Sequence, residues 1–504
     1  MGDPEAVRGF YEGSIGTTTI PWASWLPPLG YWLLFYAALY TTLISIAVIL
    51  RRQWVEHERL AYPLAQVALA MIEDEGRPSL LKPFFKNKLM WIGFAIPFLV
   101  GSLNALHHYF PSVGQIGLKT SVSFFGTNLP VNLNFLMLGF SFLINSTLSL
   151  SLWFFLLVYT LQQHVLGLLG IDTLQATLGP WSTPVTGHQM IGALIVMVGA
   201  GLWVGRHHLA EVWRQALSKK ASADDADEIM SYRSALLGLL VGTAGMTIWL
   251  WQSGIPAWIA PLFVFAALVI FIGLTRAIVE AGIPTLSPAM VPLGFVVSGV
   301  GVPALGAKGM VASAYSLIWV GELLVFMMAP LSNGLRLTSE TAGNRRRLLW
   351  GIAAAMFITL AVSIYYTLHL AYDYGGVNLH NQFFGQSFPS YPSRFALRKL
   401  SEPSGVSVDG WLWTLSGGLV MALLMIARQR LMFSAGWTMR YIWFSIFLAW
   451  LIKLAILRYG GVGLYHKIRP FFLGLIAGQF ATGGLWLVID AFTGTVGNVI
   501  PVMF

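Results

Sequence analysis

Charged residues are scarce in this sequence. Asp, Glu, Lys and Arg together make up 10% of the 504 residues, while hydrophobic residues make up 56%. Soluble domains carry roughly 25% charged residues. This composition excludes a soluble domain of any size. The apolar residues fall in long runs rather than in short alternating segments, which argues against a β-barrel.

Cysteine is absent altogether, which excludes disulfides, thiolate metal sites and a cysteine nucleophile. The H-E-x-x-H, G-x-S-x-G and Walker A patterns are absent as well. We therefore predict no catalytic residue, no metal site and no cofactor. The net charge of +9 would indicate nucleic acid in a soluble protein. Here the basic residues stand in short loops between apolar runs, where they set topology and contact anionic headgroups, so no nucleic-acid partner is predicted.

Long uncharged or nearly uncharged runs fill most of the chain. A helical span needs about 20 apolar residues, and two of these runs are long enough for two spans each, so we predict an all-α, polytopic transmembrane bundle of about twelve spans with broken or re-entrant segments. The runs are 29–50, 89–106, 131–170, 189–205, 234–275, 281–307, 311–335, 348–372, 411–427, 441–457 and 470–489.

The basic residues support this arrangement. The loops 51–88, 206–233, 336–347 and 428–440 hold seven, five, four and three Lys or Arg residues. All four loops fall on one side if the N-terminus is outside, 131–170 crosses twice and 281–307 crosses once. The positive-inside rule makes that side cytoplasmic.

These boundaries divide the chain. Residues 1–28 are predicted to be an extracytoplasmic segment and 29–504 a single transmembrane domain. That domain comprises a first helical half (29–205), a cytoplasmic interfacial helix and linker (206–233) and a second helical half (234–504), with an outer loop at 373–410. The acidic run Asp224, Asp225, Asp227 and Glu228 in the linker is predicted to be solvated.

Two charges at membrane depth are the first candidates for a site. Each costs roughly 2.5–3.5 kcal/mol on insertion scales, so such residues mark pathways or pair with one another. Arg276 and Glu280 are four residues apart, share one helix face and can pair. A structural ion pair and a substrate site are equally consistent with this spacing.

Directly after this pair the sequence is interrupted repeatedly, by Gly282, Pro284, Ser287 and further Gly and Pro residues up to Gly306. Such a run cannot form one continuous helix. Broken helices whose freed backbone groups bind substrate and coupling ions are a recurring device of transporters. The alternative is a kinked helix without a binding role.

Three further positions are candidates. Glu322 lies within the run 311–335 and could carry a proton, or could face an aqueous vestibule or pair with a cation. Lys453 lies within 441–457, either on the pathway or at the membrane interface. Tyr62 and Pro63 lead into a short apolar run ending at Ile72, which suits a re-entrant segment or an amphipathic surface helix.

Several motifs resemble the oligopeptide transporter (OPT) superfamily. They are Glu58-Arg59-Leu60-Ala61-Tyr62-Pro63 and the stretch from Lys453 to Gly461 that continues through Arg469-Pro470 to Gly478. Segments like 7–13, 51–56 and 149–155 recur in a bacterial branch of OPT-like membrane proteins. The resemblance implies a helical transporter fold with internal pseudo-symmetry and, as in the better-known members, proton-coupled uptake of peptides or metal chelates. Those members have more spans, so this chain is expected to lack N-terminal helices.

Together these features predict a secondary active transporter of a small polar solute, coupled to protons, in the bacterial inner membrane. Its partners would be the lipid bilayer, the solute and protons, with a homo-oligomer or a partner supplying the missing helices. Arg276 would bind an anionic group or orient Glu280, and Glu280 or Glu322 would carry the proton. The alternatives are a membrane-embedded enzyme acting on lipid-linked substrates, with Glu56-His57-Glu58 as its one candidate site, and a structural membrane subunit.

Overall fold

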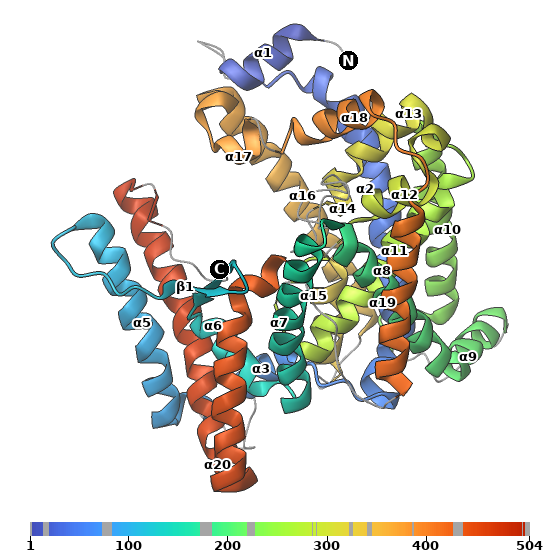
Figure 1. Cartoon of the computed structure of the whole chain (residues 1–504). Helices are drawn as coiled ribbons and strands as arrows, with labels where there is room; N and C mark the ends of the chain where they lie inside the picture. The colour runs from blue at the N-terminus through green and yellow to red at the C-terminus, as the bar shows by residue number, and fades with distance from the viewer. Residues whose placement is uncertain are drawn as a thin grey trace.

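The fold is dominated by helices (Figure 1). The computed structural model describes residues 3–13, 20–72, 83–171, 184–218, 227–284, 286–288, 290–321, 326–339, 345–385, 388–426, 437–495 and 497–498. Of these residues 81% are helical, which confirms the all-α prediction. The β structure of the described residues is one short hairpin, in which β1 (Lys119–Phe124) pairs antiparallel with β2 (Thr127–Asn132).

Nine helices of the described residues are long and apolar enough to cross a membrane. The protein is therefore a multi-pass membrane protein, although the predicted count of about twelve spans is not confirmed. The nine are α2 (Trp22–Arg52), α5 (Lys88–Tyr109), α7 (Ser146–Leu168), α8 (Pro184–Val204), α10 (Tyr232–Gln252), α11 (Ile259–Ala281), α16 (Arg346–Tyr374), α19 (Val408–Ile426) and α20 (Trp437–Thr493).

Two of these helices differ from the apolar runs in the sequence. Helix α2 begins at Trp22, within the segment predicted to be extracytoplasmic, and contains Pro27 and Pro28 in its second turn. Helix α20 has 57 residues and would measure about 85 Å if straight. A positive φ of 65° at Gly461 breaks it into two arms, which correspond to the two predicted runs.

Short apolar helices stand between the long ones. They are α3 (Pro63–Ile72), α6 (Phe135–Leu143), α12 (Pro292–Val300), α13 (Val302–Tyr315), α14 (Leu317–Val320) and α15 (Met328–Thr338). The run 131–170, predicted to cross twice, holds β2, the nine-residue α6 and the long α7. Nine residues rise only about 14 Å, less than half of the hydrocarbon core. The run 281–307 is divided between α12 and α13 at Gly301, whose φ is 84°.

The remaining elements have at most twelve residues each. They are α1 (Pro4–Glu12), the π-helical turn η1 (Gln53–His57), α4 (Pro83–Lys86), α9 (Arg206–Leu217), the 3₁₀ turn η4 (Gly376–Asn378), α17 (Asn381–Phe384) and α18 (Tyr391–Ser401). Helix α9 falls within the segment predicted to be an interfacial helix. Its Val212 and Ala216 are buried, whereas Trp213 and Leu217 are exposed.

The helices form two packed groups (Figure 1). Helix α20 packs against α5, α6 and α7, while α8 packs against α19 and α2 against α10. Backbones approach closely where glycine is present: a Cβ atom on Gly93 of α5 would lie 2.0 Å from the carbonyl oxygen of Phe471 in α20. Small residues at membrane helix interfaces allow this close approach. The second arm of α20 runs in the same direction as α5, since Met90 meets Gly474 and Tyr109 bonds Asp490.

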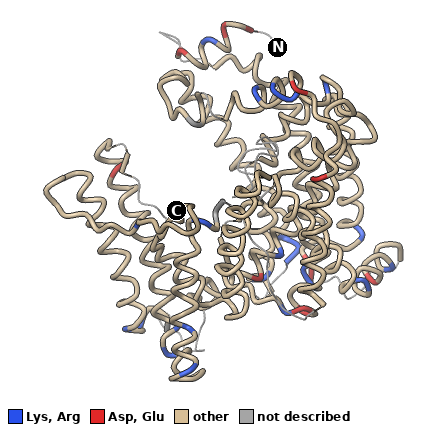
Figure 2. Tube along the Cα trace, in the orientation of Figure 1, with Lys and Arg blue, Asp and Glu red and all other residues tan. Residues whose placement is uncertain are grey.

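Basic residues gather where α2 ends. Arg51 and Arg52 close α2, Arg206 opens α9, and Arg336 and Arg345 flank the end of α15. We call this end of the molecule the basic face; Figure 2 shows Lys and Arg there and also at the other end of the trace, around α18. The basic face holds the described ends of loops 51–88, 206–233 and 336–347, which were predicted to be cytoplasmic.

Candidate functional site

The end of α11 meets the start of α3. Gly282 closes α11 in the left-handed conformation, φ 60°, and its N–H bonds the carbonyl of Ile278. Pro63, the first residue of α3, packs directly on this glycine, because a Cβ atom on Gly282 would lie 2.5 Å from the Pro63 Cβ. The Tyr62 N–H donates to the Val279 carbonyl at 2.8 Å. The structure thus brings Tyr62, Pro63 and Gly282 together, although they lie far apart in the sequence.

An ion pair adjoins this junction. The Arg276 guanidinium donates to the Glu58 carboxylate, and the two side chains are 16% and 12% exposed. Gln53 donates to the other carboxylate oxygen of Glu58 at 3.0 Å. Glu280, which helical spacing offered as the partner of Arg276, is half-buried on the same helix. Glu58 was missed as the partner because it is 218 residues away from Arg276.

A cavity of about 550 Å³ lies beside the junction on the basic face. Its polar lining comes from Glu56, Arg59, Tyr62, Gln66 and Arg336. Arg59 and Tyr62 have φ values of 52° and 46°, left-handed conformations that side chains other than glycine rarely adopt and that cost free energy. Tyr62 is also 1% exposed, and this burial raises the pKa of its hydroxyl. The loop between η1 and α3 is therefore held in an unfavourable backbone conformation at the edge of a charged cavity.

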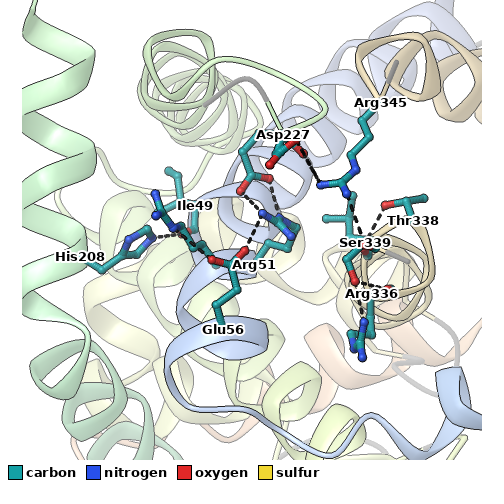
Figure 3. Close-up of polar contacts among 12 residues, drawn as sticks. Ile49, Arg51, Glu56, His208, Asp227, Arg336, Thr338, Ser339 and Arg345 are labelled. Atoms are coloured by element: carbon teal, nitrogen blue, oxygen red, sulfur yellow. Dashed lines mark hydrogen bonds and ion pairs between the residues drawn. The ribbon is translucent and has the colours of Figure 1, made fainter. Parts of the chain in front are cut away.

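A network of ion pairs covers the basic face next to the cavity (Figure 3). The Arg51 guanidinium donates to both oxygens of the Glu228 carboxylate, at 2.7 and 2.6 Å, and to Glu56 at 3.2 Å. Arg345 donates to the Asp227 carbonyl at 3.0 Å. The chain before α10 is thereby tied to the ends of α2 and α16.

The acidic run before α10 was predicted to be solvated, and for Glu228 this prediction is wrong. Glu228 is 1% exposed, whereas its neighbour Asp227 is 82% exposed. The carboxylate of Glu228 turns inward because Arg51 offers it two parallel N–H donors, the geometry that guanidinium and carboxylate groups favour. Asp224 and Asp225 lie outside the described residues.

Beyond Gly282 the chain meets packed apolar side chains. Pro284 and Ser287 are half-buried in the non-helical stretch between α11 and α12. The space beside this stretch is an apolar cavity of about 30 Å³, lined by Ile283 and Leu286 together with side chains of α7, α8, α11 and α19. Glu322, the predicted proton carrier, lies outside the described residues.

Lys453 belongs to the other packed group. Its side chain is 7% exposed, donates to the Ile144 carbonyl at 2.6 Å and lies 4.9 Å from the centre of the Tyr465 ring. Ile144 lies in the turn between α6 and α7. Asn134, before α6, bonds Ser445, so α6 runs alongside the first arm of α20, and Lys453 caps the corner where the chain turns back. The structure does not bring Lys453 together with Arg276.

The segment Glu56-His57-Glu58, the candidate for an enzyme, has both of its carboxylates in ion pairs with arginines. The His57 ring packs against that of His208 at 5.6 Å. Among the described residues there is no group of three or more His, Cys, Asp or Glu side chains that could hold a metal ion. The segment therefore contributes to an ion-paired surface.

These observations define a polytopic helical membrane protein with a charged junction between broken helices. The chain belongs to the family described as "Family of unknown function (DUF6785)", whose model matches residues 1–502. No curated protein and no solved structure matches the chain. Kinship with the oligopeptide transporter superfamily stays a prediction.

Proposed function

We propose that this protein is a secondary active transporter of a small polar solute, and that the junction of α11 with η1 and α3 lies on the solute pathway. The ion pair between Arg276 and Glu58 carries the proposal. Two charges are held, largely buried, in a bundle of membrane-spanning helices, and Glu58 is adjacent in sequence to Arg59, which lines a cavity of about 550 Å³.

The physical cost of the pair supports a functional role. Removing two charges from water costs more than their attraction returns in many proteins, so a buried pair is weak evidence for a stabilising role. Charges inside membrane proteins commonly mark ion and substrate pathways. Here the pair joins the last turns of α11 to the segment before α3, and discontinuous helices of this kind commonly form the substrate and ion sites of transporters.

A proton-coupled mechanism is consistent with the partners of the pair. Protonation of Glu58 would remove its charge and free the Arg276 guanidinium for an anionic group of the solute. Release of the proton on the other side would restore the pair. Glu58 thus joins Glu280 and Glu322 as a candidate proton carrier. Peptides and metal chelates carry suitable carboxylates, and they are the solutes that the OPT resemblance implies, with the bacterial inner membrane as the location.

The test begins with thermal unfolding of the purified protein in the presence of dipeptides, tripeptides, amino acids and metal chelates. A ligand that binds only the folded state at 100 times its Kd adds about 2.7 kcal/mol of stability. The compound that raises the melting temperature is then used for uptake into proteoliposomes with an imposed proton gradient. Uptake is compared for Glu58→Gln, Arg276→Ala, Glu322→Gln and the control Glu211→Gln, which changes an exposed carboxylate of α9.

We expect Glu58→Gln and Arg276→Ala each to lower proton-driven uptake at least tenfold, and the control to leave it unchanged. If Glu322 also carries the proton, its variant loses the dependence on the gradient. Uptake with normal pH dependence in both the Glu58 and the Arg276 variants would refute the proposed pathway. If no compound shifts the unfolding of the well-folded protein, the transporter proposal gives way to a structural subunit.

A further inference from the structure

A second polar cavity, of about 540 Å³, lies in the group formed by α5, α20 and the β1–β2 hairpin. It adjoins the end of α5 at His107 and His108, away from Lys88 and from the turn of α20 at Gly461. Small-molecule sites typically measure about 300–1,000 Å³. This cavity shares no described lining residue with the one beside Tyr62, so a ligand proposed for it does not depend on the proposed transport function.

The cavity is lined by uncharged hydrogen-bonding groups. Six carboxamides contribute to it, together with the Tyr441 hydroxyl and two imidazoles. Among the described lining residues there is no Asp or Glu, and Lys119 is the one Lys or Arg. The carboxamides are Asn104, Gln115, Asn132, Asn134, Gln479 and Asn498; apolar surface comes from Pro97, Val100, Leu118, Leu133 and Phe135.

Several of these carboxamides already have structural roles. Asn104 donates to the Ile116 carbonyl and accepts from the Ile116 N–H, which holds the chain before β1 against α5. Asn134 accepts from the Met137 N–H and caps α6. Asn498 donates to Asp490. These side chains shape the wall of the cavity.

Asn132 is different. It is 8% exposed and lines the cavity. Its backbone pairs with Lys119 in the hairpin, and its carbonyl accepts from Ser445, but its carboxamide has no hydrogen-bond partner within the described part of the chain. Its amide atoms are not among the fully buried side-chain atoms that lack a partner, so they are accessible from the cavity. Its position at the cavity wall means that a bound molecule could supply the missing hydrogen bonds.

We propose that this cavity binds a neutral polyhydroxylated solute of the size of a mono- or disaccharide. Hydroxyl groups both donate and accept hydrogen bonds, as do carboxamides, so a sugar can satisfy Asn132 from either side of its amide. The apolar side chains offer a surface for the C–H groups of the sugar ring. A zwitterionic peptide fits less well, because its ammonium group would find no carboxylate in the described lining.

The absence of cysteine from the chain makes the test direct. Gln115 is exposed and lines the cavity, so Gln115→Cys introduces one thiol there. Its rate of reaction with N-ethylmaleimide is measured in nanodiscs, since maltoside detergents would compete for a sugar site. The probes are glucose, maltose and trehalose, with alanyl-alanine and citrate for comparison. Asn378→Cys, in the outer loop, is the matched control.

We expect at least one sugar to slow the labelling of Gln115→Cys at least fivefold, without effect on the control and without protection by the dipeptide or citrate. Adding Asn132→Leu should abolish the protection. If that variant does not fold, judged by gel filtration, Asn132→Asp serves instead, because it keeps the shape and replaces the amide. Protection by none of the sugars, protection by the dipeptide or citrate alone, or protection unchanged in the Asn132 variants would each overturn the proposal.

Discussion

Removal of either partner of the ion pair between Arg51 and Glu228 should destabilise the protein, and the two substitutions should differ in their cost. The side chains are 6% and 1% exposed and make two parallel hydrogen bonds. Removal of one partner from a buried ion pair costs about 3–5 kcal/mol, because the other charge is left uncompensated. In Glu228→Ala, Arg51 keeps its contact with Glu56 at 3.2 Å, so we expect a cost of about 3 kcal/mol.

The reverse substitution should cost more. In Arg51→Ala, the buried carboxylate of Glu228 keeps only the hydroxyl of Tyr232, at 3.4 Å, as a partner in the described residues. We expect a cost near the upper limit, about 5 kcal/mol. Replacement of both by apolar residues, Arg51→Met with Glu228→Leu, leaves no charge of this pair buried and should restore most of the loss.

The assay is equilibrium unfolding in mixed micelles with increasing fractions of a denaturing detergent, which yields a free energy of unfolding for each variant. Asp227→Ala is the matched control. This neighbouring carboxylate is 82% exposed and lies 3.9 Å from Arg345, so its removal should cost less than about 1 kcal/mol. Equal effects of Glu228→Ala and Asp227→Ala, or a double variant less stable than both single ones, would refute the argument from burial.

Three further predictions concern other parts of the structure. Gly282→Ala should lower the melting temperature more than Gly306→Ala does. Both glycines have positive φ, but a Cβ atom at Gly282 would lie 2.5 Å from Pro63, while no described atom lies within 4 Å of a Cβ atom at Gly306. Equal losses would mean that backbone strain alone lowers the melting temperature. Gly93→Ala should destabilise the contact of α5 with α20 by several kcal/mol, since the backbone oxygen 2.0 Å from the added Cβ atom must move. The control Gly484→Ala adds a Cβ atom with no described atom within 4 Å and should cost nothing measurable. Thermal unfolding of the two variants measures the difference. Burial lowers the pKa of His208 below its usual 6.5, so the folded state favours the neutral ring. The stabilisation from the neutral ring is complete above pH 6.5, and the stability of the protein should fall as the pH drops below 6.5. The fall should be smaller in His208→Gln, and identical pH profiles for the two proteins would exclude this histidine as the cause.

The membrane class of this protein could be predicted from the sequence because it depends on composition and on the length of uncharged runs. Spans such as α10 and α11 are separated by polar turn residues that any bilayer-spanning chain must place at an interface. The repeated Gly and Pro residues after Glu280 indicated interrupted helices, and α12 and α13 are short for that reason. The count of spans was less accessible, since a run of apolar residues does not reveal that α6 stops after nine residues.

The partners of charged residues could not be predicted, because they depend on segments that meet only in the tertiary structure. Helical spacing pointed from Arg276 to Glu280, while the packing of α3 against the end of α11 brings Glu58 to Arg276 from 218 residues away. The same holds for Glu228, whose sequence neighbours indicate a solvated acid until Arg51 is placed beside it. What the sequence determined was where the chain could leave water, since that depends on local transfer free energies. Which buried charges and amides meet, and which amide, like that of Asn132, is left without a partner among the described residues, was decided by tertiary packing alone.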